Sequence, residues 1–234
     1  MKRTLVISDI HGELQKFEQL LKKMEYNHEE DQLILLGDYV DRGPNAKEVL
    51  EKVIKLKENG ARVLKGNHED LMIKALTTDV ERAWNHWVML CGGDATLYSY
   101  GFSEENIAVN EEDFKKPVLQ SDILQKHLEF IQSLELYIET PEYIFVHAGV
   151  EPTTPISETD PHLLIWIRDV FHKGYTGEKT VIFGHTETNS LHNDTENNNV
   201  YFGSNRIIGI DGGAVYGGQL NCLELPSQKV FSVK

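Results

Sequence analysis

The chain has 234 residues, of which 40% are hydrophobic and 26% are charged. This length fits one ample domain, at roughly 100–200 residues per domain, and the composition excludes both a disordered chain and a small disulfide scaffold. Its 23 Lys and Arg residues against 37 Asp and Glu residues give a formal net charge of −14, which excludes a partner such as nucleic acid or an anionic membrane because a surface this negative repels polyanions.

The first 67 residues repeat a short apolar run followed by a helical stretch. The apolar runs at 4–7, 33–36 and 61–64 predict strands, and the segments between them carry apolar residues at helical spacing. Asn59-Gly60 is a good helix stop before the third run. The sequence therefore predicts a βαβαβ unit, in which the three strands are parallel.

The rest of the chain mixes helices and strands. A helical, aromatic stretch at 84–101 precedes an acidic segment at 104–113, which we expect to be an exposed irregular loop, and a helix is predicted at 123–134. The Asn-rich segment at 186–205 predicts a mobile loop. Further strands are predicted at 136–138, 143–146, 181–183, 206–210, 219–225 and 229–233. No long repeat and no linker is evident, so we predict one mixed α/β domain over residues 1–234.

Cysteine usage and hydropathy bear on the compartment. Cys91 and Cys222 are the only cysteines, and two isolated thiols suit a reducing compartment. No apolar run approaches the ~18 residues of a membrane span, and the four-residue run at 4–7 is far short of a signal-peptide core. We therefore expect a cytoplasmic protein that does not cross a membrane.

Polar residues cluster where each of the first three predicted strands ends. The clusters are Asp9-Ile10-His11-Gly12, Gly37-Asp38-Tyr39-Val40-Asp41-Arg42-Gly43 and Gly66-Asn67-His68-Glu69. From Asp9 to Asp38 is 29 positions, and from Asp38 to Asn67 is again 29. Because each interval is one strand–helix–strand step, all three clusters should emerge at the carboxyl edge of the sheet, where open α/β sheets place their sites.

Each cluster alone has an ordinary structural explanation. The first fits a turn with a solvated histidine, the second fits helix N-caps beside a surface arginine, and the third fits a turn. Together, however, three carboxylates, an amide and two imidazoles at one edge would be unstable without cations to balance them. The joint pattern therefore favours a metal site.

Two more histidines directly follow predicted strands, in His147-Ala148-Gly149 and in Gly184-His185-Thr186. Either one alone could be a satisfied core histidine. Added to the three clusters, they favour metal ligation. Nitrogen and oxygen ligands without thiolate fit Mn, Fe, Zn or Co and do not choose among them.

These motifs resemble the signature of the calcineurin-like metallophosphoesterases, and more narrowly of the phosphoprotein phosphatase family with its bacterial and phage members. Asp211-Gly212-Gly213-Ala214, followed by Gly217-Gly218-Gln219-Leu220, fits the same family, so the resemblance covers nearly the whole chain. It implies a four-layer α/β/β/α sandwich with a mixed central β-sandwich. It also implies a metal-dependent phosphomonoester hydrolase, specifically a serine/threonine protein phosphatase acting on a phosphorylated protein or a small phosphoester.

Two other functions compete with that one. A bis(5'-nucleosyl)-tetraphosphatase on the same fold would need the same metals, so the motifs do not separate it from a protein phosphatase, although the acidic balance disfavours a highly charged nucleotide. A non-catalytic binding module would be expected to lack ligands or the acid, and every expected position is filled. The oligomeric state is not indicated by the sequence.

The resemblance also implies roles for individual residues. Two divalent metal ions, with Mn expected in vitro, would be held by Asp9, His11 and Asp38 on one side and by Asp38, Asn67, His147 and His185 on the other, with Asn67 also facing the substrate. A metal-bound hydroxide would be the nucleophile, and His68 would be the general acid, oriented by Asp41. Arg42 and Arg168 would bind phosphate, although Arg168 also fits a surface helix.

Three positions depart from the family pattern. Ser8 replaces the commoner Gly beside Asp9, and Cys91 stands where relatives tend to have Asn before Gly92-Gly93. Glu187 follows Gly184-His185-Thr186 where bacterial relatives often have Pro.

Overall fold

The computed structural model describes residues 3–109 and 114–234 and contains two five-stranded mixed sheets. The first sheet has the order β10-β9-β1-β2-β3, in which the neighbouring strands β1, β2 and β3 are parallel, β9 runs antiparallel to β1, and β10 pairs antiparallel with β9. Its strands are β1 (Arg3–Ile7), β2 (Asp31–Leu35), β3 (Arg62–Val63), β9 (Leu220–Leu225) and β10 (Val230–Val233). Helices α1 (Leu14–Lys23) and α2 (Ala46–Glu58) connect the parallel strands, so the βαβαβ prediction is confirmed.

The second sheet has the order β4-β5-β6-β8-β7. Strands β5, β6 and β8 are parallel, and β4 and β7 pair antiparallel at the two edges. Its strands are β4 (Tyr137–Glu139), β5 (Tyr143–Val146), β6 (Thr180–Phe183), β7 (Tyr201–Phe202) and β8 (Ile207–Gly209). Both sheets therefore contain three parallel strands, whose carboxyl ends can supply a site.

Strand alternation divides the core into layers, because successive side chains of a strand point to opposite faces. In β1, Leu5 and Ile7 pack into the core beneath the helices of the first sheet, whereas Val6 packs between the two sheets. In β5, Phe145 joins Val6 between the sheets, and Val146 faces the helices on the far side. The result is the four-layer α/β/β/α sandwich that the resemblance implied.

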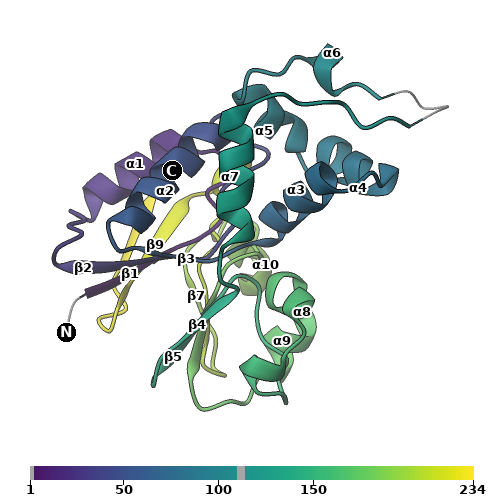
Figure 1. The fold of residues 1–234 in the computed structure, drawn as a ribbon. Helices are drawn as coiled ribbons and strands as arrows, with labels where there is room; N and C mark the ends of the chain where they lie inside the picture. Colours follow the sequence, from purple (N-terminus) through teal and green to yellow (C-terminus); the bar gives the residue numbers. More distant parts are fainter. Residues whose placement is uncertain (1–2, 110–113) are drawn as a thin grey trace.

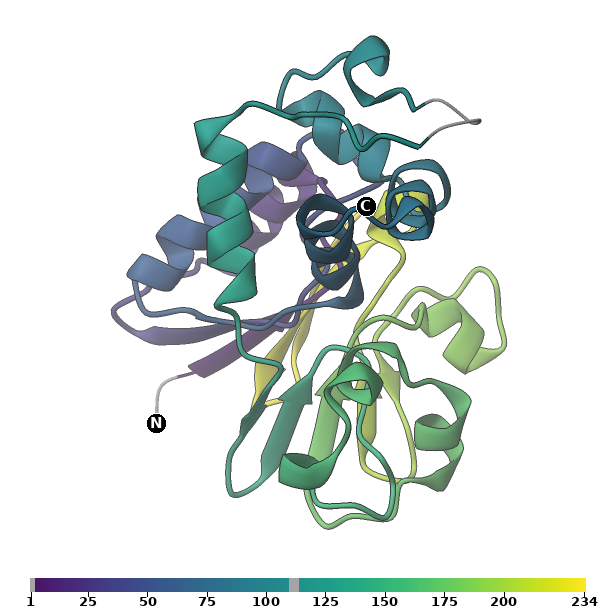
Figure 2. The same cartoon turned by 45° about the vertical axis from the view of Figure 1, so that its right-hand side comes forward.

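Figures 1 and 2 show these layers, with α1, α2 and α7 (Asp122–Gln132) over the first sheet and α8 (Pro161–Trp166) and α9 (Asp169–Gly174) beside the second. Between α2 and α7 the chain forms α3 (Asn67–Thr77), α4 (Glu81–Asn85), a π-helical turn at His86–Leu90 and α5 (Gly93–Ser99). No helix among the described residues is long and apolar enough to cross a membrane.

Two segments predicted as loops contain regular structure. Within 104–113, Glu104–Ile107 forms the short helix α6, because Ser103 and Asn106 cap its first turn; residues 110–113 lie outside the described residues. Within 186–205, Thr188–His192 forms α10 and Tyr201–Phe202 forms β7. The prediction of continuous loops was wrong here because a single helical turn or a two-residue edge strand is too short to show a hydrophobic period.

Candidate metal centre

The carboxyl ends of the parallel strands bring the predicted polar residues together from both sheets. Asp9 and His11 follow β1, Asp38 follows β2, and Asn67 begins α3 just after β3. The second sheet contributes the two histidines that follow β5 and β6, His147 and His185. These six side chains are buried, in line with their grouping in one site.

The backbone at this edge is strained in a way that points to function. Left-handed φ angles are uncommon for residues other than Gly, and such residues persist where the surrounding structure holds them in place. Ten residues other than Gly have positive φ in the described chain, and six of them belong to the predicted site: Asp9, His11, Asp38, Asp41, Arg42 and His185. The turns after β1, β2 and β6 therefore aim these side chains at the cost of local strain.

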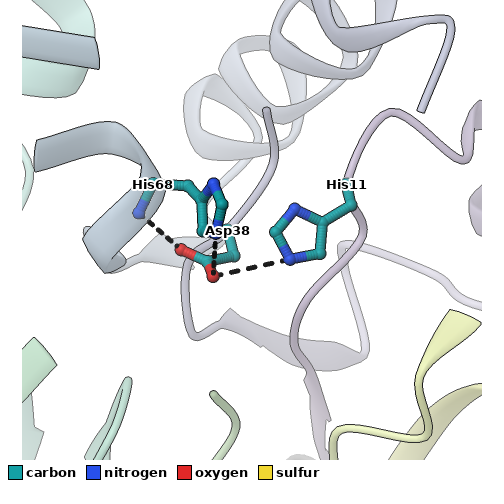
Figure 3. A group of neighbouring side chains, drawn as sticks. All are labelled: His11, Asp38 and His68. Atoms are coloured by element: carbon teal, nitrogen blue, oxygen red, sulfur yellow. Dashed lines mark hydrogen bonds and ion pairs between the residues drawn. The ribbon is translucent and has the colours of Figure 1, made fainter. Parts of the chain in front are cut away.

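Asp38 lies between two imidazole rings. Its Oδ2 is 3.5 Å from His11 Nε2, and its Oδ1 is 3.5 Å from His147 Nε2. Figure 3 shows its carboxylate facing His11 on one side and His68 on the other. Asp38 is thus the one side chain shared by two groups of candidate ligands, His11–Asp38–His68 and Asp38–His147–His185, whose ligand atoms lie within 4.8 Å of one another in each group.

A buried glutamate fixes the turn that carries Asp38. Glu69 Oε2 accepts hydrogen bonds from the backbone N–H groups of Asp38 and Gly66, both at 2.9 Å, and its Oε1 accepts from the N–H of Tyr39 at 2.8 Å. The turn after β2 is thereby tied to the start of α3. In the sequence, Glu69 stands out only as the last residue of Gly66-Asn67-His68-Glu69, a pattern that does not indicate this structural role.

Hydrogen-bond acceptors face one another on the second sheet's side of the site. His147 Nδ1 lies 3.1 Å from the carbonyl oxygen of Leu36, a contact that places the ring proton on Nδ1 and leaves a lone pair on Nε2. That Nε2 is 2.8 Å from Asn67 Oδ1, which is in turn 2.9 Å from His185 Nδ1. Acceptors converging in this way are the expected arrangement around a cation, so these residues fit a metal ion.

On the first sheet's side of the site, the His11 ring is oriented by a backbone carbonyl oxygen in the same way as the His147 ring. Its Nδ1 lies 2.8 Å from the carbonyl oxygen of Val40, which leaves Nε2 as an acceptor. Asp9 belongs to neither compact group, but its carboxylate lines the same pocket and accepts hydrogen bonds from the backbone N–H of His185 at 3.0 and 3.2 Å. The predicted ligands of both metal positions are therefore present around Asp38.

Burial dominates the electrostatics of the site. It raises the pKa of Asp9 to about 6 and the pKa of Asp38 well above its usual range, with the mutual repulsion of the two carboxylates adding to the shift of Asp38. Burial also lowers the pKa of His147 to about 3, so this imidazole is neutral at pH 7. Neutral imidazoles beside carboxylates that lack a matching cation are a donor set that a divalent cation would satisfy.

His68 and Asp41 form a buried pair beside Asp38. His68 Nδ1 is 2.6 Å from Asp41 Oδ2, and the same carboxylate accepts hydrogen bonds from Trp87 Nε1 at 3.0 Å and Thr96 Oγ1 at 2.7 Å. Burial lowers the pKa of His68 well below its usual value and raises the pKa of Asp41 to about 8. The pair is therefore well oriented, but protonation of His68 needs a further negative charge nearby.

Two arginines line the pocket above these residues. Arg42 Nη1 contacts His11 Nε2 at 2.7 Å, and its guanidinium lies 5.1 Å from the centroid of the Tyr216 ring. Arg168 follows α8 outside any helix and donates to Thr186 Oγ1 at 2.9 Å. Arg168 therefore does not lie within a helix: it is an exposed residue in the turn before α9 whose side chain lines the pocket, and its role in binding phosphate stays a prediction.

Several pocket residues carried no predicted role. All of them line the same pocket as the predicted site residues: His86, Cys91, Trp166, Glu187, Ser190, Asp211 and Tyr216. Cys91 and Glu187 stood out in the sequence only as departures from a pattern, and Asp211 only as part of a motif. His127 does not line this pocket: it is buried, with its Nδ1 2.5 Å from Tyr100 Oη.

Comparison with known proteins gives a family. The family model described as Calcineurin-like phosphoesterase matches residues 2–219. The chain is similar to "Serine/threonine-protein phosphatase 1" of Salmonella typhimurium, with 28% identity over 92% of this chain and 88% of the relative. It is also similar to an asymmetrical bis(5'-nucleosyl)-tetraphosphatase of Bacillus velezensis, with 25% identity over 98% of this chain and 91% of the relative.

A solved structure agrees in fold. A protein serine/threonine phosphatase from Saccharomyces cerevisiae matches with a TM-score of 0.65 and 14% identity, over all of this chain and 80% of that one. Because the family model covers most of the sequence, the chain belongs to the calcineurin-like phosphoesterase family and is a phosphate-ester hydrolase.

Proposed function

We propose that this member of the calcineurin-like phosphoesterase family is a serine/threonine protein phosphatase that uses a dinuclear metal centre. The observation that carries the proposal is the position of Asp38, whose two carboxylate oxygens each lie 3.5 Å from a different buried imidazole nitrogen. A carboxylate shared in this way suits two ions held close together. We further propose that residues 1–234 form one domain. We also propose that the protein functions in the cytoplasm, because its two cysteines are free thiols, as is usual in a reducing compartment.

The proposed ligands divide into two sets that share Asp38. One ion would be held by Asp9, His11 and Asp38, and the other by Asp38, Asn67, His147 and His185. Divalent ions at such a centre bind phosphate oxygens and bring the pKa of water close to neutral, which is the chemistry that phosphate-ester hydrolysis needs. The donors are nitrogen and oxygen only, which suits Mn, Fe, Zn or Co, with Mn the ion proposed for assays.

Arg42 and Arg168 are proposed to bind the phosphate. Both side chains line the pocket that is also lined by four of the proposed metal ligands, Asp9, Asp38, Asn67 and His185. A guanidinium can donate two parallel hydrogen bonds to phosphate oxygens, which a lysine ammonium cannot reproduce. The contact of Arg42 with the Tyr216 ring limits where its guanidinium can move, so the pocket is partly organised before a substrate arrives.

His68 is proposed as the general acid that donates a proton to the leaving oxygen. Its Nδ1 is engaged by Asp41, so Nε2 is the atom left to face the substrate. Burial opposes the charged imidazole, but the dianionic phosphate bound between the arginines would bring negative charge close to the ring and favour its protonation. Asp41 would orient the ring, and its contacts with Trp87 and Thr96 would hold Asp41 itself in place.

The second candidate function is a bis(5'-nucleosyl)-tetraphosphatase. It is favoured by the relatives that carry this name and align over nearly the whole chain. The metal ligands and the general acid would serve either reaction, so the substrate would be selected by the residues at the mouth of the pocket. The formal net charge of −14 supports the phosphoprotein, because a tetraphosphate would approach against a stronger repulsion.

The deciding experiment is an activity panel on protein reconstituted with Mn²⁺. It compares phosphoserine, phosphothreonine and phosphotyrosine peptides with diadenosine tetraphosphate, by kcat/KM at one ionic strength. We expect the phosphoserine and phosphothreonine peptides to be the better substrates. A higher kcat/KM for diadenosine tetraphosphate would replace the proposed function with the second candidate.

A further inference from the structure

Glu187 lies at the pocket mouth, on the turn between β6 and α10. It follows the proposed metal ligand His185 by two residues, and its side chain is half-buried and lines the pocket. Its carboxylate lies over Gly213, since a Cβ placed on that glycine would stand 2.9 Å from Glu187 Oε2. The carboxylate is therefore next to the segment that carries Tyr216, whose ring contacts Arg42.

Glu187 has a second carboxylate for a neighbour. Asp211 lines the same pocket, and its Oδ1 accepts a hydrogen bond from the backbone N–H of Gly213 at 2.9 Å. Within the described part of the chain, neither carboxylate makes an ion pair. Asp211 is 7% exposed, whereas Glu187 is half-buried, so Glu187 is the carboxylate that a bound ligand would meet.

The Arg and Lys side chains described at this pocket can balance the charge of one phosphate group but not of a second anionic group. Arg42 and Arg168 are the only Arg or Lys residues lining the pocket among the described residues. Both are proposed to bind the scissile phosphate, whose two negative charges they balance. Among the described residues of the pocket, a second anionic group on the substrate would find no further Arg or Lys and would face the charge of Glu187 instead.

The Tyr216 ring also favours a positively charged group on the substrate. Its face already holds a guanidinium at 5.1 Å, and 59% of the residue is exposed at the pocket mouth. Aromatic faces attract cations through the ring quadrupole. Glu187 and Tyr216 therefore form one wall that is favourable to a cationic group and unfavourable to an anionic one.

We propose that Glu187 is a specificity-determining residue that selects phosphate monoesters with a cationic group beside the phosphate and rejects those with a second anionic group. The inference rests on the proposed site, in which Arg42 and Arg168 bind the phosphate, and it deepens the proposed function. For a protein substrate it means basic residues near the phosphorylated Ser or Thr. The charge of Glu187 acts on binding and turnover of such substrates without touching the reacting atoms.

The test uses pairs of phosphate monoesters with opposite flanking charge, and each pair is compared between protein variants so that other differences within the pair cancel. The small pair is phosphoethanolamine and phosphoglycolate, and the large pair is a phosphothreonine peptide flanked by Arg and the same peptide flanked by Glu. The quantity measured is the ratio of kcat/KM, cationic over anionic, in Mn²⁺-loaded wild-type protein and in Glu187→Gln. We expect this ratio to fall about three- to tenfold in the variant, as fits one charge acting at ~6–10 Å in a partly solvated pocket.

Two further variants and a salt series test whether the change in the ratio comes from the charge at position 187. Glu187→Lys should lower the ratio further than Glu187→Gln, because it reverses the charge. Glu196→Gln removes the same charge from an exposed position that does not line the pocket, and it should leave the ratio unchanged. In wild-type protein the ratio should shrink as NaCl is raised from low to molar concentration, because salt screens a Coulombic preference.

The outcome can be separated from that of the proposed function. If the phosphopeptides are not hydrolysed, the protein phosphatase proposal fails, while phosphoethanolamine and phosphoglycolate still measure the effect of Glu187. An unchanged ratio in Glu187→Gln for every pair that is hydrolysed would overturn the inference. An equal shift in Glu196→Gln would also overturn it, because the preference would then come from the general charge of the surface.

Discussion

Gly66 packs against the carboxylate of Asp38 so closely that a Cβ at position 66 would stand 2.2 Å from Asp38 Oδ1. The φ angle of Gly66 is −96°, which any residue adopts, so its small size is needed for this contact rather than for its backbone conformation. The carboxylate proposed to be shared by two metal ions is therefore positioned by the absence of a side chain.

Gly66→Ala should weaken metal binding without removing a ligand. The added methyl group must displace the Asp38 carboxylate or the start of α3, and we expect a loss of about 10–100-fold in metal affinity, as for changes to groups that support ligands. Metal titration followed by elemental analysis measures it. Gly174→Ala is the control, because that glycine ends α9 without a positive φ and an added Cβ would meet only the Pro152 ring, at 3.3 Å; equal affinities in the two variants would contradict the expected role of Gly66.

Removal of the metal should abolish activity reversibly. Protein treated with a chelator should lose hydrolysis of nitrophenyl phosphate and regain it with Mn²⁺. Asp38→Asn should be the most damaging single ligand change, because it weakens both proposed metal positions. Asp79→Asn, at a side chain that is 93% exposed, should behave as wild type. Full activity in chelator, with no metal found by elemental analysis, would rule out the dinuclear centre.

His68→Asn should discriminate between leaving groups. A phosphoserine ester expels a basic alkoxide that needs a proton, whereas a nitrophenyl ester expels a stable phenolate. We expect a loss in kcat of ~10²–10⁴-fold on the alkyl ester and a distinctly smaller loss on the aryl ester. Asp41→Asn should show the same selectivity in weaker form, because Asp41 orients the ring.

Wild type, His68→Asn and Asp41→Asn are assayed on both esters at saturating metal, and the metal content of each protein is measured. Equal losses on the two esters would show that His68 acts on substrate position or on the metal centre, and another residue would have to donate the proton.

Arg168→Ala should raise KM and lower kcat/KM while metal content stays unchanged. The guanidinium lines the pocket and is held by Thr186 Oγ1 at 2.9 Å, so its loss removes a phosphate contact but no metal ligand. Arg62→Ala is the matched control, because that arginine pairs with Glu135 at the surface. Wild-type kinetics in Arg168→Ala would remove Arg168 from the proposed phosphate site.

The stabilisation that protonated Asp41 gives the metal-free protein should be lost as the pH rises from about 6.5 to 8. Burial raises the pKa of Asp41 from 3.8 to about 8, so the folded state keeps this proton where the unfolded state has released it. A group with a raised pKa in the folded state stabilises at low pH, and its contribution is lost as the pH rises toward 8. Buried histidines such as His147, whose pKa is lowered to about 3, act in the opposite direction, because an unfolded imidazole still releases its proton in the lower part of this window.

The expected loss is about 1–2 kcal/mol in the free energy of unfolding, at roughly 1.4 kcal/mol per pH unit for one proton. Urea unfolding in chelator at several pH values measures it as the difference in slope between wild type and Asp41→Asn, in which this loss is absent. An unchanged slope in Asp41→Asn would contradict the raised pKa of Asp41.

The sequence by itself determined the three parallel strands of the first sheet and the grouping of polar residues at their carboxyl edge. Apolar runs at 4–7 and 33–36 with helical spacing between them are strong local signals, and β1 and β2 lie within two residues of those runs. Equal intervals of 29 residues then place Asp9, Asp38 and Asn67 at one edge, because each interval is one strand–helix–strand step. That edge does hold the grouped side chains.

Only the tertiary structure decided which residues surround that edge. Asp9, Arg168 and Glu187 are far apart in the sequence and come from both sheets, so no local pattern places them in one pocket. Burial is likewise a property of the packed molecule: it sets the pKa shifts of Asp41 and His68, which sequence neighbours do not indicate. The residues proposed to carry the chemistry could be identified from local patterns, whereas their charges and partners depend on long-range packing between the two sheets.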